Sequence, residues 1–233
     1  MAKAETTKLE RATGSAAVSE GGETSKFNAQ PRATLAAYHI QVAAALARQA
    51  KHIESDDVTR AFDKASNPIF WTVSGSVVMA WAALEANINQ HIKTLEEANA
   101  GNTGLIERCS FLYLEHVIAK YEGLARLKDY ELIESDEIFE NLKILRGFRN
   151  ALVDFQPEWL DDEVKHAELC KRMGEIVKPL FGMPSDAPFP FCHLGYECAK
   201  WAVLTAASFS AHYAKLVGIE DHLAASWVDL KLP

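Results

Sequence analysis

The sequence has no apolar run as long as a membrane-spanning helix requires. Its longest apolar run covers residues 69–84, which are sixteen residues that include Thr72, Ser74 and Ser76. A spanning helix needs about 20 apolar residues. The first 26 residues also lack the apolar stretch of a secretory signal. We therefore expect a protein of the cytoplasm that neither spans nor binds a membrane.

The sequence contains few cysteines, and its basic residues are fewer than its acidic residues. The four cysteines, at positions 109, 170, 192 and 198, form no CxxC pair, which favours a reducing compartment over a disulfide framework. The 24 Lys and Arg residues are outnumbered by 32 Asp and Glu residues, and the formal net charge is -8. This balance argues against a broad cationic surface that grips nucleic acid. It leaves room for a small site built from a few local arginines.

Several well-known catalytic motifs are absent. The chain contains no GxGxxG, GxxxxGK[ST], GxSxG or HExxH, so phosphate loops, the nucleophile elbow and the common zinc-protease helix have no support. Cys192 and His193 with Cys198 would provide three metal ligands, but the spacing fits no common knuckle and no fourth ligand is evident. We expect neither a metal nor a cofactor. Glu115-His116 resembles an acid–base pair, although a polar contact between helices is the simpler interpretation.

The composition divides the chain into a tail and one folded domain. Residues 1–26 contain no aromatic side chain and are rich in Ala, Glu, Thr, Ser and Gly. Such a segment has little to bury, and we expect a flexible N-terminal tail. Phe27 and Pro31 mark the entry to a folded domain over residues 27–233.

The folded part has the residue pattern of helices almost throughout. Apolar side chains recur every three or four residues, which is the spacing of one helix face, and no stretch alternates as a strand would. The pattern predicts an all-α domain, a single helical bundle of five to seven helices. The expected helices cover residues 34–53, 68–98, a third through 106–119, 135 to a stop at Pro157, 161–177 and 196–217, with only loop over 178–195.

Polar and charged residues gather near the end of the helix that begins at residue 135. The segment LRGFRNALVDF, residues 145–155, places Arg146, Arg149, Asn150 and Asp154 within nine residues. Asn150 and Asp154 share a helix face because they are four residues apart. A carboxylate near a helix C-terminus is poorly placed for the helix dipole. The cluster therefore indicates either a binding site or a structural network in which Arg149 pairs with Asp154.

This segment resembles the signature of HEPN domains, an all-α family whose active members are metal-independent ribonucleases. Their signature is an Arg followed by a polar residue such as Asn, and then a His four to six residues after the Arg. Arg149-Asn150 fits its first part. The segment WAALEANIN, residues 81–89, is similar to the long early helix of the family, with Glu85 toward the site, and YECAKWA, residues 196–202, is similar to its last helix.

The family His is missing from this chain. Asp154 and Phe155 stand where that His would be. In the active family the His would transfer the proton when a ribose 2′-hydroxyl attacks the phosphate, and imidazole suits this role because it titrates near neutral pH. An Asp is a poor acid near pH 7 and repels phosphate. The resemblance thus implies the fold more strongly than it implies cleavage.

Three functions are open at this point. The first is a non-catalytic or degenerate, nuclease-derived HEPN-like module that dimerises and binds RNA, a nucleotide or a partner protein, as in bacterial defence or toxin–antitoxin systems. The second is a HEPN ribonuclease with Arg149, Asn150, Asp154 and Glu85 in its active site. The third is an unrelated helical scaffold. Since HEPN nucleases commonly build their cleft from two copies of the Arg motif, the resemblance also implies a homodimer.

Overall fold

The structure is a computed structural model that describes residues 35–56, 68–132, 136–154, 166–178, 180, 189–224 and 232. All of these lie in one compact unit, residues 33–233. The predicted tail over residues 1–26, and the entry to the domain at Phe27, lie outside the described residues.

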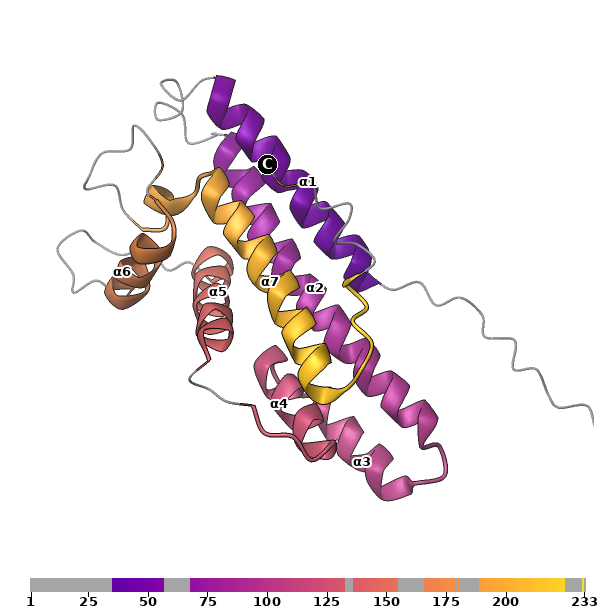
Figure 1. The fold of residues 1–233 in the computed structure, drawn as a ribbon. Coiled ribbons are helices and arrows are strands. Elements are labelled where there is room, and N and C mark those ends of the chain that lie inside the picture. The colour runs from indigo at the N-terminus through magenta and orange to yellow at the C-terminus, as the bar shows by residue number, and fades with distance from the viewer. Residues whose placement is uncertain are drawn as a thin grey trace, which may run out of the picture. The chain divides into compact units, whose positions relative to one another are not determined.

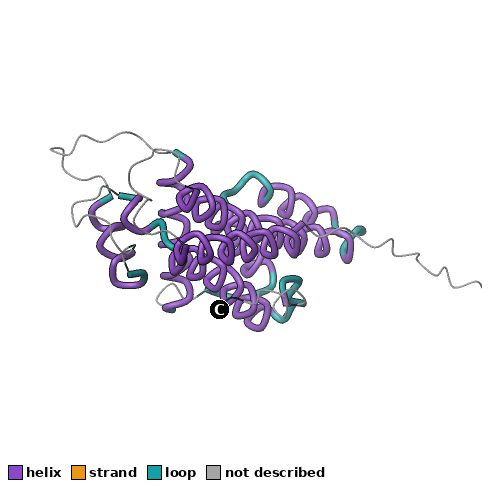
Figure 2. The backbone as a smooth tube through the Cα atoms, turned by 90° about the horizontal axis from the view of Figure 1, so that it is seen from above, coloured by secondary structure: helices purple, strands orange, loops and turns teal. Residues whose placement is uncertain are grey.

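The described residues form helices and connections only, which confirms the predicted all-α class (Figures 1 and 2). Seven α-helices and one short 3-10 helix are present in this part of the chain, and it contains no strand. The elements are α1 (Leu35–Asp56), α2 (Pro68–Ala98), α3 (Thr103–Leu112), α4 (Val117–Leu127), α5 (Glu137–Val153), α6 (Ala167–Ile176), η2 (Phe191–His193) and α7 (Tyr196–Val217).

Helix α2 is the central helix. It begins at Pro68, whose fixed φ suits the first helical position, and runs for 31 residues. It packs against α1, α3, α4, α5 and α7, and Figure 1 shows α1 and α7 running along it. Val73, Val77, Leu84 and Ile88 of α2 are fully buried. The core of the domain therefore surrounds α2 on several sides.

The length and composition of α2 would also permit a membrane span. Its most apolar window has a mean hydropathy of 1.4, and half of that window is buried inside the protein. The central helix of a folded domain has the same properties, so the expected cytoplasmic location stays a prediction.

Small side chains let α1 approach α2 closely. Five alanines of α1 have no exposed surface, namely Ala36, Ala43, Ala44, Ala47 and Ala50. Ser76 of α2 donates a hydrogen bond of 2.8 Å to the carbonyl oxygen of Ala43. Because alanine loses no side-chain entropy in a helix, this face combines high helix propensity with a short distance between helix axes.

A buried polar network joins α2, α4 and α7. The Asn87 side chain is fully buried, and its amide donates to Tyr121 Oη at 3.3 Å and to Ser210 Oγ at 3.1 Å. Tyr121 Oη donates to the carbonyl oxygen of Leu84 at 2.9 Å, and Ser210 Oγ donates to Asp221 at 2.7 Å. Hydrogen bonds between buried partners fix the register of the three helices, since a shift of any helix would leave polar groups unpaired.

The last helix, α7, confirms the predicted range of residues 196–217. Its first backbone N–H groups lack partners within the helix, and the Glu54 carboxylate of α1 accepts the N–H of Tyr196 at 2.7 Å. The helix ends at Gly218, whose φ of +66° is the left-handed conformation that glycine adopts without strain.

The predicted third helix is wrong in its extent. It is broken into α3 and α4 by a turn around Tyr113–His116. His116 is the N-cap of α4, and its Nδ1 accepts the N–H of Ala119 at 3.1 Å. The Glu115-His116 pair is therefore a helix cap in this structure. The expected loop over 178–195 also needs correction, because it contains the 3-10 helix η2.

We expect Asn87→Ala to lower the free energy of unfolding by about 2–3 kcal/mol, because the change leaves a cavity and removes two buried hydrogen bonds. Asn99→Ala is the matched control. Among the described residues its side-chain amide bonds only the Leu95 carbonyl in the last turn of α2, and we expect a loss below about 1 kcal/mol. Urea denaturation followed by circular dichroism measures both values. Equal losses for the two variants would show that the network does not hold the helices together.

Candidate functional site at the end of helix α5

Arg149 and Asn150 lie in the last turns of α5 and contact each other. Arg149 Nη1 donates a hydrogen bond of 3.1 Å to Asn150 Oδ1. The Nε atom of Arg149 is buried and has no hydrogen-bond partner among the described residues. A buried donor without a partner costs about 1–3 kcal/mol, so this guanidinium has hydrogen-bonding capacity that the described protein groups do not use.

Asp154 lies at the C-terminal end of α5 and forms no salt bridge with Arg149 in the described part of the chain. It is the C-cap residue, is exposed, and its backbone N–H donates to the Asn150 carbonyl at 2.8 Å. Within the described part of the chain its carboxylate forms no ion pair. The structural network in which Arg149 is neutralised by Asp154 is therefore not formed.

The rest of α5 explains why this end of the helix is fixed in place. Asp136 caps the first turn, where its side chain accepts the N–H of Ile138 at 3.3 Å. Leu145 and Phe148 are fully buried in the core. Gly147 faces α6 so closely that an added Cβ would lie 3.3 Å from Leu169. The contacts with the core and with α6 therefore fix the position of this part of α5, and Arg149 belongs to the same part of the helix.

A pocket of about 310 Å³ adjoins this end of α5. It is mostly apolar and is formed by the start of α2, the end of α5 and the η2 segment. Its walls are Phe70, Trp71, Ser74, Ala151, Leu152, Pro190, Phe191 and Leu194. The Phe70 and Phe191 rings lie 5.2 Å apart and join α2 to η2.

Large apolar side chains are exposed around the pocket. Trp71 is 63% exposed and Val153 is 50% exposed. Phe191 of η2 is also exposed. Exposed apolar residues that gather beside a pocket are typical of surfaces that bind a partner.

Glu85 does not join Arg149 and Asn150 as expected. It forms an ion pair with Lys120 of α4 at 3.6 Å, and no hydrogen bond links it to either predicted partner. Lys120 is nearly buried, and a buried ammonium group needs such a partner. The physical reason is the placement of α5. Its end packs near Ser74, whereas Glu85 lies eleven residues further along α2, which is about 16 Å of helix.

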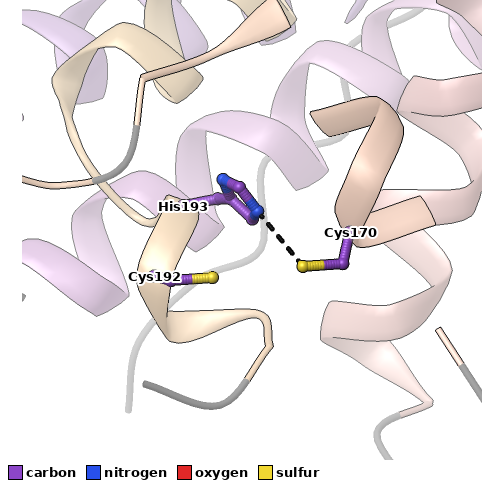
Figure 3. Close-up of side chains that lie close together, drawn as sticks. All are labelled: Cys170, Cys192 and His193. Carbon is purple, nitrogen blue, oxygen red and sulfur yellow. Dashed lines mark hydrogen bonds between the residues drawn. The ribbon is translucent and has the colours of Figure 1, made fainter. Parts of the chain in front are cut away.

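The structure brings together three side chains that the sequence analysis only partly grouped. Cys170 Sγ of α6 lies 3.6 Å from His193 Nε2, and the sulfur of Cys192 completes the cluster (Figure 3). Burial, followed by the neighbouring Cys170, raises the pKa of Cys192 to about 11, and burial lowers the pKa of His193. Cys198, the ligand considered from sequence, is instead fully buried in α7. Nothing in the sequence spacing indicates that Cys170 meets Cys192.

A pair of stacked histidines was also not foreseen. The His91 and His222 rings stack at 4.6 Å and line a pocket of about 300 Å³ together with Lys128 and Glu220. Burial, then the charges of His222 and Lys128, lowers the pKa of His91 to about 3. His91 is therefore uncharged at neutral pH, and its Nε2 has no hydrogen-bond partner among the described residues.

In comparisons with known proteins, no family model, curated protein or solved structure matches this chain. The resemblance to HEPN domains therefore rests on the sequence segments quoted above.

Substitutions at the two ends of α5 test whether the Asp154 side chain contributes to the stability of the fold. We expect Asp154→Ala to change the free energy of unfolding by less than about 0.5 kcal/mol, because the side chain is exposed and forms no ion pair among the described residues. Asp136→Ala removes the N-cap of the same helix and should cost about 1 kcal/mol. Thermal and urea denaturation measure both. A loss of several kcal/mol for Asp154→Ala would indicate a buried ion pair and favour the scaffold interpretation.

Proposed function

We propose that this chain is a HEPN-like helical module that binds and does not efficiently cleave its ligand. In this proposal two copies form a homodimer, and Arg149 of each copy contacts a phosphate group of RNA or of a nucleotide. The setting would be a defence or toxin–antitoxin system of the kind that uses HEPN-like proteins.

The observation that carries the proposal is the state of Arg149. Its guanidinium is partly buried, has an unpaired Nε and contacts only a neutral amide among the described residues. Arg146, one turn earlier, forms no ion pair in that part of the chain either. A planar guanidinium that pairs with no carboxylate is well suited to bind phosphate oxygens in pairs. The pocket at the same end of α5, lined by Ala151 and Leu152 of that helix, offers apolar walls that suit a nucleotide base.

The exposed carboxylate of Asp154 favours binding over cleavage. A carboxylate accepts hydrogen bonds but has no proton to donate to a leaving group. Its negative charge would also repel a phosphate at the end of α5. Glu85 is engaged with Lys120 and so is not part of the proposed site.

The exposed apolar side chains near the pocket support a homodimer through this surface. Trp71 is the largest of them, and it extends from the first turn of α2 beside η2. A two-fold interface buries the same patch on both copies. In that arrangement each Arg149 would lie near the interface, and two such groups could contact one ligand.

We expect the native chain to bind a fluorescently labelled single-stranded RNA of mixed sequence in low salt without added divalent metal. Arg149→Ala should weaken binding about 10- to 100-fold, since hydrogen bonds to charged groups contribute about 1.5–3 kcal/mol each. Arg126→Ala is the control, because Arg126 is an exposed arginine of α4, away from α5, that pairs with Glu122 of the same helix. Fluorescence anisotropy measures the affinities.

The same reactions, analysed on a denaturing gel, test for cleavage. Little or no cleavage by the native chain is expected, and Asp154→His should increase it, because imidazole supplies the group that titrates near pH 7. Robust cleavage by the native protein that is lost in Arg149→Ala would favour the ribonuclease alternative. Equal RNA affinity for native chain, Arg149→Ala and Arg126→Ala would remove Arg149 from the site.

We expect light scattering to give about twice the chain mass of 25.8 kDa, and Trp71→Glu to give the monomer mass. A Glu in the first turn of a helix is favourable for the dipole, so the variant should fold. Leu114→Glu is the control, because Leu114 is 85% exposed in the α3–α4 connection, away from this pocket. A native monomer at micromolar concentration, or equal effects of both changes, would contradict the proposed interface.

A further inference from the structure

The cluster of Cys170, Cys192 and His193 combines the residue types that bind soft metal ions. Their potential ligand atoms, two sulfurs and one ring nitrogen, all lie within 4.8 Å of one another. Figure 3 shows the three side chains pointing into the same space, with Cys170 on α6 and the other two on η2. The cluster therefore joins two segments that are far apart in the chain.

One distance in the cluster fits an edge of a tetrahedral zinc site. Zinc binds sulfur at about 2.3 Å and histidine nitrogen at about 2.0–2.1 Å, so the edge between a sulfur and a nitrogen ligand is about 3.6 Å in tetrahedral geometry. Cys170 Sγ and His193 Nε2 are 3.6 Å apart. The sulfur of Cys192 lies within 4.8 Å of both atoms, so a small movement would bring it into coordination.

We propose that Cys170, Cys192 and His193 bind one Zn²⁺ ion, with a water molecule in the fourth position. Two thiolates and a neutral imidazole balance the charge of Zn²⁺, so the occupied site has no net charge to bury. The inference rests on these three side chains alone and does not depend on the proposed function.

The surroundings of His193 favour a metal over a simple thiol–imidazole hydrogen bond. Its side chain is nearly buried, and among the described residues its Nε2 contacts only the thiol of Cys170. Without a metal, the ring would be buried with one weak contact to a thiol, which does little to offset the loss of hydration. A zinc–nitrogen bond provides much more binding free energy, and this free energy adds to folding.

The segments that carry the cluster are fixed by local packing. Met173, Val177, Leu180 and Leu194, which belong to α6, η2 and the residues beside them, are all buried. The N–H of Leu180 donates to the Cys192 carbonyl at 2.9 Å, which ties the segment after α6 to η2. Cys170 and Cys192 are themselves only partly buried, so a metal ion can reach their sulfurs.

The metal would also stabilise the wall of the pocket near Arg149. The Phe189 ring lies 5.6 Å from Phe148, the neighbour of Arg149, and 6.2 Å from His193. Pro190 and Phe191, next to the two η2 ligands, line that pocket. A zinc ion bridging α6 and η2 would therefore hold this wall in position.

The test uses the full chain, reduced and stripped of metal under anaerobic conditions. Zn²⁺ is titrated against a chromophoric chelator, and Co²⁺ is added to parallel samples. We expect about one ion per chain, and visible Co²⁺ bands of tetrahedral coordination with a thiolate charge-transfer band. Cys170→Ser and Cys192→Ser should each weaken Zn²⁺ binding by at least about 100-fold and reduce the thiolate band.

Cys198→Ala is the matched control, because Cys198 is a buried cysteine of α7 outside the cluster. It should bind zinc as the native chain does. Circular dichroism of each variant establishes that it is folded, and both cysteines changed to serine are only half-buried. Substoichiometric binding by the folded native chain, octahedral Co²⁺ bands, or equal loss of binding in Cys198→Ala would each overturn the zinc site. None of these readouts involves RNA, so they leave the test of Arg149 separate.

Discussion

The burial of helix α2 is the constraint on which the rest of this structure depends. Its apolar residues are spread over much of its circumference, and burying them is the dominant favourable contribution to folding. No single neighbour can cover such a helix. Helices α1, α4, α5 and α7 share the task, and the alanine face of α1 and the Asn87 network are the local solutions that set distance and register.

The same constraint places the candidate site. The start of α2 reaches η2 through Phe70 and meets the end of α5 near Ser74. Helix α6 then closes against Gly147 of α5. One region of the domain therefore holds an incompletely paired arginine, an apolar pocket and a cluster of thiols with an imidazole. Each of these has an exposed or unsatisfied group.

Long helices with regularly spaced apolar residues could be predicted from the sequence. A short break between two helices that depends on a polar cap could not. The ranges of α2 and α7 follow from uninterrupted apolar spacing with Pro68 and Gly218 at their ends. The break between α3 and α4 was missed because His116, a residue without a strong capping preference, acts as the N-cap.

For the site, the composition of the α5 end identified Arg149 and Asn150, which do contact each other. The predicted contact of Glu85 with Arg149 is wrong because a sequence does not show at which level α5 packs against α2. Lys120 is the partner that lies close to Glu85. Cys170 was overlooked for a similar reason. Its neighbours in the cluster, Cys192 and His193, follow a proline-rich segment of the sequence. Only the three-dimensional fold shows that they lie next to Cys170 of α6.

The central claim is that the Arg149 guanidinium is available to an anionic ligand. Nuclear magnetic resonance of the arginine Nε–H groups observes this atom directly, and its resonance is assigned by its absence in Arg149→Lys. The account predicts that adding single-stranded RNA shifts this resonance strongly and shifts that of Arg126 little. An Arg149 resonance that does not move at saturating RNA, or that moves no more than the resonance of Arg126, would contradict it.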